Sequence, residues 1–190
     1  MTTRSKKPLP RYCAPPTLEW AARPDPTPIL LASGLEPAQV EAILQPYGLQ
    51  RIKDADANLQ SMAGDPHQRR QLAVILPSLL EAIGKTADPD LALNQWERWL
   101  ASGVSRSAVL EYLRGAPCMV DLVCVIFGNS NSLASTLVRD PLLLYWLAQQ
   151  KVLSTAPTKM GMERTVRQNL ETVDATELKL DALRRFRRRE

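Results

Sequence analysis

The most apolar part of the chain, residues 117 to 147, constrains the fold more than any other stretch. Within it, residues 119 to 127 are apolar on nearly every face of a helix, which is typical of a helix surrounded by other elements. Asp121 and the polar residues 128 to 132 keep this run shorter than the ~20 apolar residues that a membrane span needs. The sequence therefore predicts a buried core helix.

Two further helices are predicted in the same stretch. Leu133, Leu137 and Val138 recur at helical spacing, and the pair Asp140 and Pro141 then begins a third helix that is rich in leucine. Because very short turns join the three helices, they must fold against one another. We expect the other segments to pack on this core.

Amphipathic stripes predict helices on both sides of the core. Their apolar positions fall within residues 37–46, 52–63, 66–83, 89–100, 109–113, 162–173 and 177–186, with a loop at 154–161. Pro77 should kink the helix in which it lies. No segment combines strand-like alternation with many β-branched residues. The predicted fold class is all-α, an irregular multi-helix bundle of about 8–10 helices.

An Asp-Pro pair recurs at residues 65–66, 88–89 and 140–141, each time before an apolar helix. An Asp side chain can accept hydrogen bonds from the free N–H groups of a helix start, and Pro fits the first helical position. We therefore interpret these three acids as helix caps.

The carboxylates and the single histidine do not form a recognisable catalytic set. Asp54 and Asp56 lie within a predicted helix, where the side chains of alternate residues point in different directions. In the second pair, Asp88 and Asp90, we interpret Asp88 as a helix cap. These observations argue against a metal site at either pair. His67 follows a helix start, so we interpret it as a surface or capping residue. The sequence has no glycine-rich phosphate loop and no nucleophile elbow. We expect no catalysis and no bound cofactor or metal from this chain alone.

The cysteines and the chain start indicate a cytoplasmic protein. Cys13, Cys118 and Cys124 make an odd number without metal-ligand spacing, and we interpret them as free thiols that act as small buried hydrophobes. Free thiols fit a reducing compartment. No secretory signal and no membrane span are predicted.

We predict two regions along the chain, a basic, largely extended arm over residues 1–34 and a helical domain over 35–190. The arm has seven prolines within its first 28 residues. Leu18, Trp20 and residues 29–31 could dock it on the body. Residues 1–16 carry +4 and residues 184–190 carry +4; since the whole chain carries +4, the residues between carry −4. This distribution argues against a broad nucleic-acid surface.

The last predicted helix ends in a cluster of arginines, and this cluster is the candidate contact site of the sequence. Its members are Arg184, Arg185, Arg187, Arg188 and Arg189. The cations could lie on a solvated face at the helix C-terminus, contact an acidic partner or a following domain, or touch nucleic acid, the least favoured of the three. The helix has no stop signal, so we expect it to continue past Glu190.

Several segments, taken in order, resemble the N-terminal helical region of the glutamine synthetase adenylyltransferase/adenylyl-removing enzyme family. The resemblance covers roughly Tyr47 to the end of the sequence. The segments are Gly64-Asp-Pro-His-Gln-Arg-Arg-Gln-Leu-Ala, Ala87-Asp-Pro-Asp-Leu-Ala-Leu, Phe127-Gly-Asn-Ser with Leu133-Ala, Leu137-Val-Arg-Asp-Pro to Trp146-Leu147, and Leu183-Arg-Arg-Phe-Arg-Arg-Arg-Glu190.

The resemblance implies a role in controlling nitrogen assimilation. In that family a nucleotidyltransferase domain follows the helical region and uses a Gly-Ser turn and an Asp-x-Asp pair to hold Mg²⁺ against ATP or AMP. That signature is absent from this sequence. The resemblance therefore implies a scaffold or recognition segment whose partners are glutamine synthetase, a PII-type regulatory protein and a downstream catalytic domain. A free-standing helical adaptor without enzymatic activity is the alternative.

Overall fold

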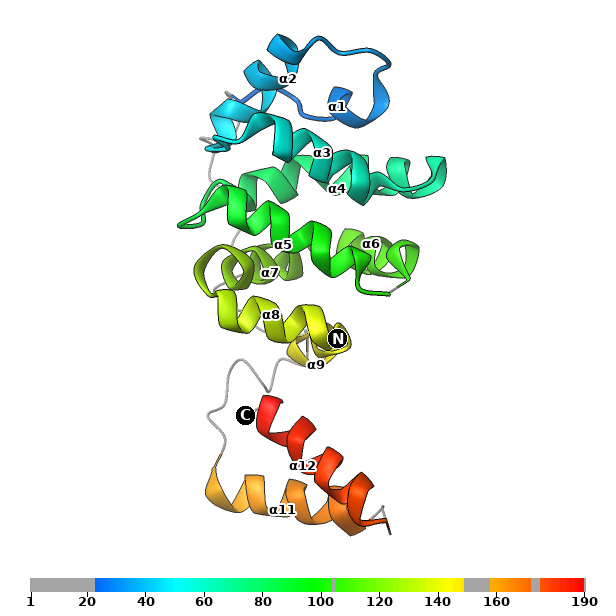
Figure 1. Ribbon diagram of the computed structural model, residues 1–190, viewed down its shortest axis with the longest axis vertical. Coiled ribbons are helices and arrows are strands. Elements are labelled where there is room, and N and C mark those ends of the chain that lie inside the picture. Colours follow the sequence, from blue (N-terminus) through cyan, green and yellow to red (C-terminus); the bar gives the residue numbers. More distant parts are fainter. Residues whose placement is uncertain (1–22, 104, 149–157, 172–174, 190) are drawn as a thin grey trace, which may run out of the picture. The chain divides into compact units, whose positions relative to one another are not determined.

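The computed structural model describes residues 23–103, 105–148, 158–171 and 175–189, and these residues fall into two compact units. The first unit extends to Arg139 and the second begins at Asp140. Helices are the only regular secondary structure of the described residues, which confirms the all-α fold class (Figure 1). None of the described helices is both long and apolar enough to cross a membrane.

The first unit contains eight α-helices and one 3-10 helix among its described residues. They are α1 (Pro28–Leu31), α2 (Pro37–Leu44), the 3-10 helix η3 (Gln45–Tyr47), α3 (Ile52–Ala63), α4 (Pro66–Ile83), α5 (Pro89–Ala101), α6 (Arg106–Gly115), α7 (Pro117–Asn129) and α8 (Asn131–Arg139). Helix α4 packs on α3, α6 and α7, while α5 packs on α3, α7 and α8. Helix α7 thus packs against both α4 and α5, as its apolar sequence predicts.

Aromatic rings join α5 to α7 at the centre of this core. The ring centroids of Trp96 and Trp99 on α5 lie 5.3 Å apart, and each ring also meets Phe127 of α7 edge to face, at 5.5 and 5.9 Å. All three side chains are fully buried. Edge-to-face contacts of this kind add to the stabilisation from burial. The predicted core helix is confirmed, and its aromatic contacts are with α5.

The Asp-Pro prediction is confirmed at two of its three positions. The Asp65 carboxylate accepts hydrogen bonds from the backbone N–H groups of His67 and Gln68, both at 2.8 Å, and the Asp88 carboxylate accepts one from Leu91 at 2.9 Å. Pro66 and Pro89 are the first residues of α4 and α5. Helix α4 continues through Pro77 to Ile83.

The third Asp-Pro pair does not begin a helix. Helix α9 (Leu143–Leu147) starts two residues after Pro141 and belongs to the second unit. The carbonyls of Asp140 and Pro141 instead accept from the N–H groups of Leu143 and Leu144, three residues on. These bonds close a tight turn ahead of the helix, so the predicted cap at Asp140 is wrong.

The described part of the N-terminal arm is fastened to α3 and α4. Residues 1–22, with Leu18 and Trp20, lie outside the described residues. Ile29 and Leu30 of α1 are buried, which confirms their predicted docking, whereas Leu31 is 53% exposed and does not dock. An ion pair of 2.7 Å joins Arg23 to Glu81 of α4. The predicted domain boundary at residue 35 stays a prediction.

The second unit contains a helical hairpin, formed by α11 (Lys159–Glu171) and α12 (Thr176–Arg189). Helix α11 begins inside the segment predicted to be a loop. Thr158 explains the early start, because its hydroxyl accepts from the N–H of Gly161 and its carbonyl accepts from the N–H of Met162. A threonine at this position caps a helix, and the pattern of apolar residues alone does not reveal it. The predicted cap at Asp174 lies outside the described residues.

Candidate functional site: interhelix joints and a basic hairpin

The first segment of the resemblance begins at Gly64, where the end of α3 meets α5 and α6. Gly64 ends α3 with a positive φ of 57°, a conformation that favours glycine. The guanidinium of Arg106, on α6, donates to the carbonyl of Ser61 at 2.9 Å and to that of Leu100 at 3.1 Å. Arg106 therefore satisfies free carbonyls at the ends of both α3 and α5.

The same segment also holds α1. Arg69 of α4 donates to the carbonyl of Leu30 at 3.1 Å and to the side chain of Gln60 at 2.8 Å, and Gln60 donates to the carbonyl of Ile29 at 3.0 Å. These bonds satisfy carbonyls of the short helix α1, which is too short to satisfy its own.

The second segment of the resemblance contains two carboxylates, Asp88 and Asp90, which hold different parts of the structure. Asp88 caps α5, as described above. The two oxygens of Asp90 accept from the backbone N–H groups of Gln50 and Arg51, each at 3.1 Å, and so hold the start of α3 against α5. The Asp88-x-Asp90 pair is thus engaged with backbone N–H groups of separate segments.

The third segment closes the end of α7 against the turn between α4 and α5. A Cβ atom at Gly128 would lie 2.3 Å from Cβ of Thr86, so only glycine permits this approach. The side chain of Asn129 accepts from the N–H of Ala87 at 3.2 Å and donates to the carbonyl of Val125 at 2.8 Å. Residues that carry the resemblance therefore form joints between helices.

The other candidate residues do not converge. Asp54 and His67 are exposed, and Asp56 accepts from Gln60 four residues later in the same helix. Within the described ranges, no group of three metal-ligating residues lies together. Cys118 is half-buried and Cys124 fully buried, both on α7. Cys13 lies outside the described residues.

Burial perturbs two ionisable groups on α7. Desolvation raises the pKa of the Cys124 thiol far above its ordinary value, although Trp96 donates a hydrogen bond to the sulfur at 3.2 Å. Desolvation also raises the pKa of Asp121, and Lys85 partly offsets this effect. The thiolate is the reactive form of cysteine, so Cys124 is an inert packing residue, as the sequence predicts.

The arginine cluster lies on α12, whose bounds include all five arginines. The side chains of Arg184 and Arg187 are exposed, and neither forms an ion pair with another described residue. The side chains of Arg185, Arg188 and Arg189 lie outside the described residues. A role for the cluster in partner contacts stays a prediction.

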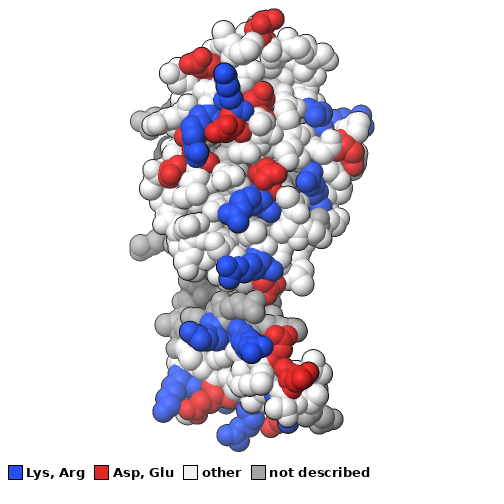
Figure 2. Space-filling view, viewed as in Figure 1, with Lys and Arg blue, Asp and Glu red and all other residues white. Residues whose placement is uncertain are grey.

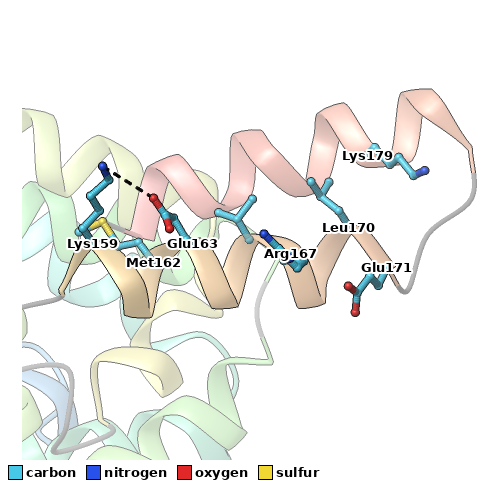
Figure 3. Close-up of a pocket in the computed structure, with 8 residues that line it drawn as sticks. Lys159, Met162, Glu163, Arg167, Leu170, Glu171 and Lys179 are labelled. Carbon is cyan, nitrogen blue, oxygen red and sulfur yellow. Dashed lines mark ion pairs between the residues drawn. The ribbon is translucent and has the colours of Figure 1, made fainter.

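An open groove of about 740 Å³ runs along the hairpin. Met162, Val166 and Leu170 of α11 form its apolar floor, and Lys159 and Lys179 lie at its edges. Figure 3 shows Leu170 pointing from α11 toward α12 and the Lys159–Glu163 ion pair near the start of α11. The groove was not predicted, because helical periodicity shows which face of a helix is apolar but not how far a neighbouring helix covers that face.

Charge is mixed on the visible surface. Figure 2 shows Lys and Arg side chains interspersed with Asp and Glu side chains over the described residues on that face. A surface that binds nucleic acid collects positive charge on one side instead.

The relatives of this chain share one description. This chain is 34% identical over 119 residues to the bifunctional glutamine synthetase adenylyltransferase/adenylyl-removing enzyme of Xanthobacter autotrophicus. The aligned residues cover 63% of this chain and 12% of that enzyme. The enzyme of the same description from Bartonella quintana is 30% identical over 118 residues, covering 62% of this chain and 12% of its own length. That of Corynebacterium glutamicum is 24% identical over 161 residues, covering 82% of this chain and 15% of its own length.

These relatives confirm the resemblance. The chain spans between 12% and 15% of the length of these three curated relatives. No model of a known protein family matches the chain. No solved structure matches it either.

Proposed function

We propose that this chain, a relative of bifunctional glutamine synthetase adenylyltransferase/adenylyl-removing enzymes, is the N-terminal helical scaffold and recognition segment of such an enzyme. It braces a nucleotidyltransferase domain and takes part in the contact with glutamine synthetase. Its role would be to support AMP transfer to and from that enzyme, and so to regulate nitrogen assimilation.

The contacts that the segments of the resemblance make between helices support this proposal. Gly64, Asp90, Gly128 and Asn129 each join two or more helices rather than lining a common cavity. A segment whose characteristic residues fix the relative positions of helices is suited to holding other groups in place. Chemistry requires a constellation of reactive groups, which these residues do not form.

Nucleotide and metal would be bound outside this chain. Under the proposal, ATP or AMP and Mg²⁺ belong to the downstream catalytic domain, and a PII-type protein regulates the assembled enzyme. Metal-assisted transfer depends on carboxylates aimed at a phosphate. Here three of the four paired carboxylates of the sequence accept hydrogen bonds from the protein itself: Asp56 from Gln60, Asp88 from Leu91, and Asp90 from Gln50 and Arg51.

A chimera tests the bracing role. The part of the Xanthobacter autotrophicus enzyme that aligns with this chain is replaced by the matching residues of this chain, and AMP transfer to purified glutamine synthetase is measured. The comparison enzyme lacks the aligned part altogether. We expect the chimera to retain AMP transfer that the shortened enzyme has lost. A chimera no more active than the shortened enzyme would contradict the bracing role.

A capture assay tests recognition separately. The full chain is immobilised and exposed to glutamine synthetase with and without attached AMP, and phosphate-dependent AMP release is followed in parallel. We expect capture without AMP release. AMP release by the chain alone would show a catalytic site that the proposal denies. Absence of capture, together with an inactive chimera, would leave the adaptor hypothesis.

A further inference from the structure

Three leucines of α12, in the hairpin, are exposed to solvent. On α12, Leu178 is 57% exposed, Leu180 49% and Leu183 39%. Helix α11 has no buried residue, and none of the described side chains of α12 is buried, so the described part of the hairpin encloses no core of its own. Scattered apolar residues are ordinary on a protein surface, whereas exposed apolar residues that share one face mark a candidate binding surface.

The side of α12 turned toward α11 is a different one. Lys179, Ala182 and Phe186 are half-buried and recur at a spacing of three and four residues, which places them on one side of the helix. Lys179 also lines the groove between the two helices (Figure 3). Leu180 therefore lies outside this packed side, and Leu183, four residues after Lys179 and three before Phe186, lies at its border.

Positive charge accompanies the two leucines. Leu180, Leu183, Arg184 and Arg187 follow the i, i+3, i+4, i+7 pattern and so share a face of α12. Arg184 and Arg187 are exposed and form no ion pair with another described residue. The helix dipole favours cations near the C-terminus of a helix and so accounts for the arginines. It does not account for the exposed leucines beside them.

We propose that Leu180, Leu183, Arg184 and Arg187, here called the Leu-Arg face, bind an amphipathic helix that carries an apolar stripe flanked by Asp or Glu. Ridges at this spacing accept a third helix along a hairpin, which completes a three-helix bundle. The cations flanking the leucines select acidic flanks on the partner. The inference deepens the proposed function, on which its biological meaning rests, because it specifies the chemistry of the surface that the scaffold would engage.

Two designed helical peptides test the Leu-Arg face without any component of AMP transfer. Both are about three heptads long with leucine at the a and d positions; one has Glu at e and g and the other has Lys. Binding to the full chain is followed by fluorescence anisotropy. We expect the Glu peptide to bind about tenfold more tightly, since each surface pair contributes a small factor and the Lys peptide is repelled.

Substitutions locate the binding. The double variant Leu180→Ser and Leu183→Ser should bind neither peptide, and the double variant Arg184→Glu and Arg187→Glu should prefer the Lys peptide. The matched control is Met160→Ser, because Met160 is 78% exposed on α11, outside the Leu-Arg face. It should bind like the unaltered chain.

Three results would overturn the inference: equal binding of the two peptides, binding that survives both double variants, or no binding at all. Sedimentation of the chain alone adds a fourth. If the chain forms a dimer that the leucine double variant abolishes, the face belongs to a second copy of the chain. Each of these results leaves the chimera and capture experiments untouched, so failure here is separable from failure of the proposed function.

Discussion

Replacing Gly128 by alanine should destabilise the first unit. A Cβ atom at this position would lie 2.3 Å from Cβ and 2.4 Å from Oγ1 of Thr86. Carbon atoms in contact normally keep about 3.5–4.0 Å between them, so α7 or the turn after α4 has to move by more than about 1 Å. Thr86 resists this movement, because its hydroxyl and its N–H both donate to the carbonyl of Ile83, at 2.7 and 2.9 Å.

The expected loss follows from two opposing effects. Inserting a methyl group into a packed contact costs about 1–3 kcal/mol, and the restrained Thr86 places this case near the upper end. Alanine recovers up to about 1 kcal/mol through its higher helix propensity. The net decrease in the free energy of unfolding is therefore about 2 kcal/mol, which lowers the melting temperature by about 6–8 °C.

Gly115 supplies the matched control. It also ends a helix, α6, but nothing lies within 4 Å of the position its Cβ would take, and its φ is not positive. Gly115→Ala should be neutral or raise the free energy of unfolding by up to about 1 kcal/mol. Both variants are compared by thermal and urea unfolding, followed by circular dichroism and tryptophan fluorescence. If Gly128→Ala is as stable as Gly115→Ala, the close approach to Thr86 does not exist.

Three further predictions concern a cap, a thiol and a carboxyl group. Asp88→Ala should lower the free energy of unfolding by about 1 kcal/mol in urea titrations, and Asp140→Ala, which removes no cap, should leave it nearly unchanged; equal losses would contradict this assignment. In a variant with the other two cysteines replaced by serine, the Cys124 thiol should react with Ellman's reagent only on unfolding, and rapid labelling of the folded protein would refute its burial. Because burial raises the pKa of Asp121 above its ordinary value of 3.8, the folded state holds its proton more tightly, and the stability from this group is lost as the pH rises through the raised pKa. Asp121→Asn should therefore be more stable than the unaltered chain at pH 7, with a difference that shrinks below about pH 4; a constant difference across pH would show that desolvation is not the cause.

Sequence patterns were sufficient wherever the responsible contacts are local. The apolar run in α7, the stripes of α3 to α6 and the caps at Asp65 and Asp88 depend on residues a few positions apart, so helical periodicity and capping chemistry predict them. The same local rules failed at Asp140, where a tight turn takes the carbonyls, and at Thr158, whose capping lies in a segment predicted to be a loop.

The candidate site was only partly accessible from the sequence. The arginines on α12 were predicted as a contact cluster, and the segments of the resemblance were found in order. That three leucines of α12 stay exposed was not predicted, since an apolar stripe is the same whether a neighbour covers it or not. Helical periodicity gives the faces of a helix, and only tertiary packing decides which of them stays open.

The sequence by itself determined the all-α class, most helix bounds and the relationship to the adenylyltransferase enzymes. The first two depend on the spacing of apolar residues a few positions apart, and the third depends on short segments that occur in a fixed order. Tertiary structure alone decided what the shared residues do. Arg69 reaches the carbonyl of Leu30 from 39 positions away, and Asp90 reaches the N–H of Gln50 from 40. Gly128 must be glycine because Thr86, from another segment, occupies the space beside it. Such pairings depend on how helices pack in three dimensions, and no local pattern in a single sequence encodes them.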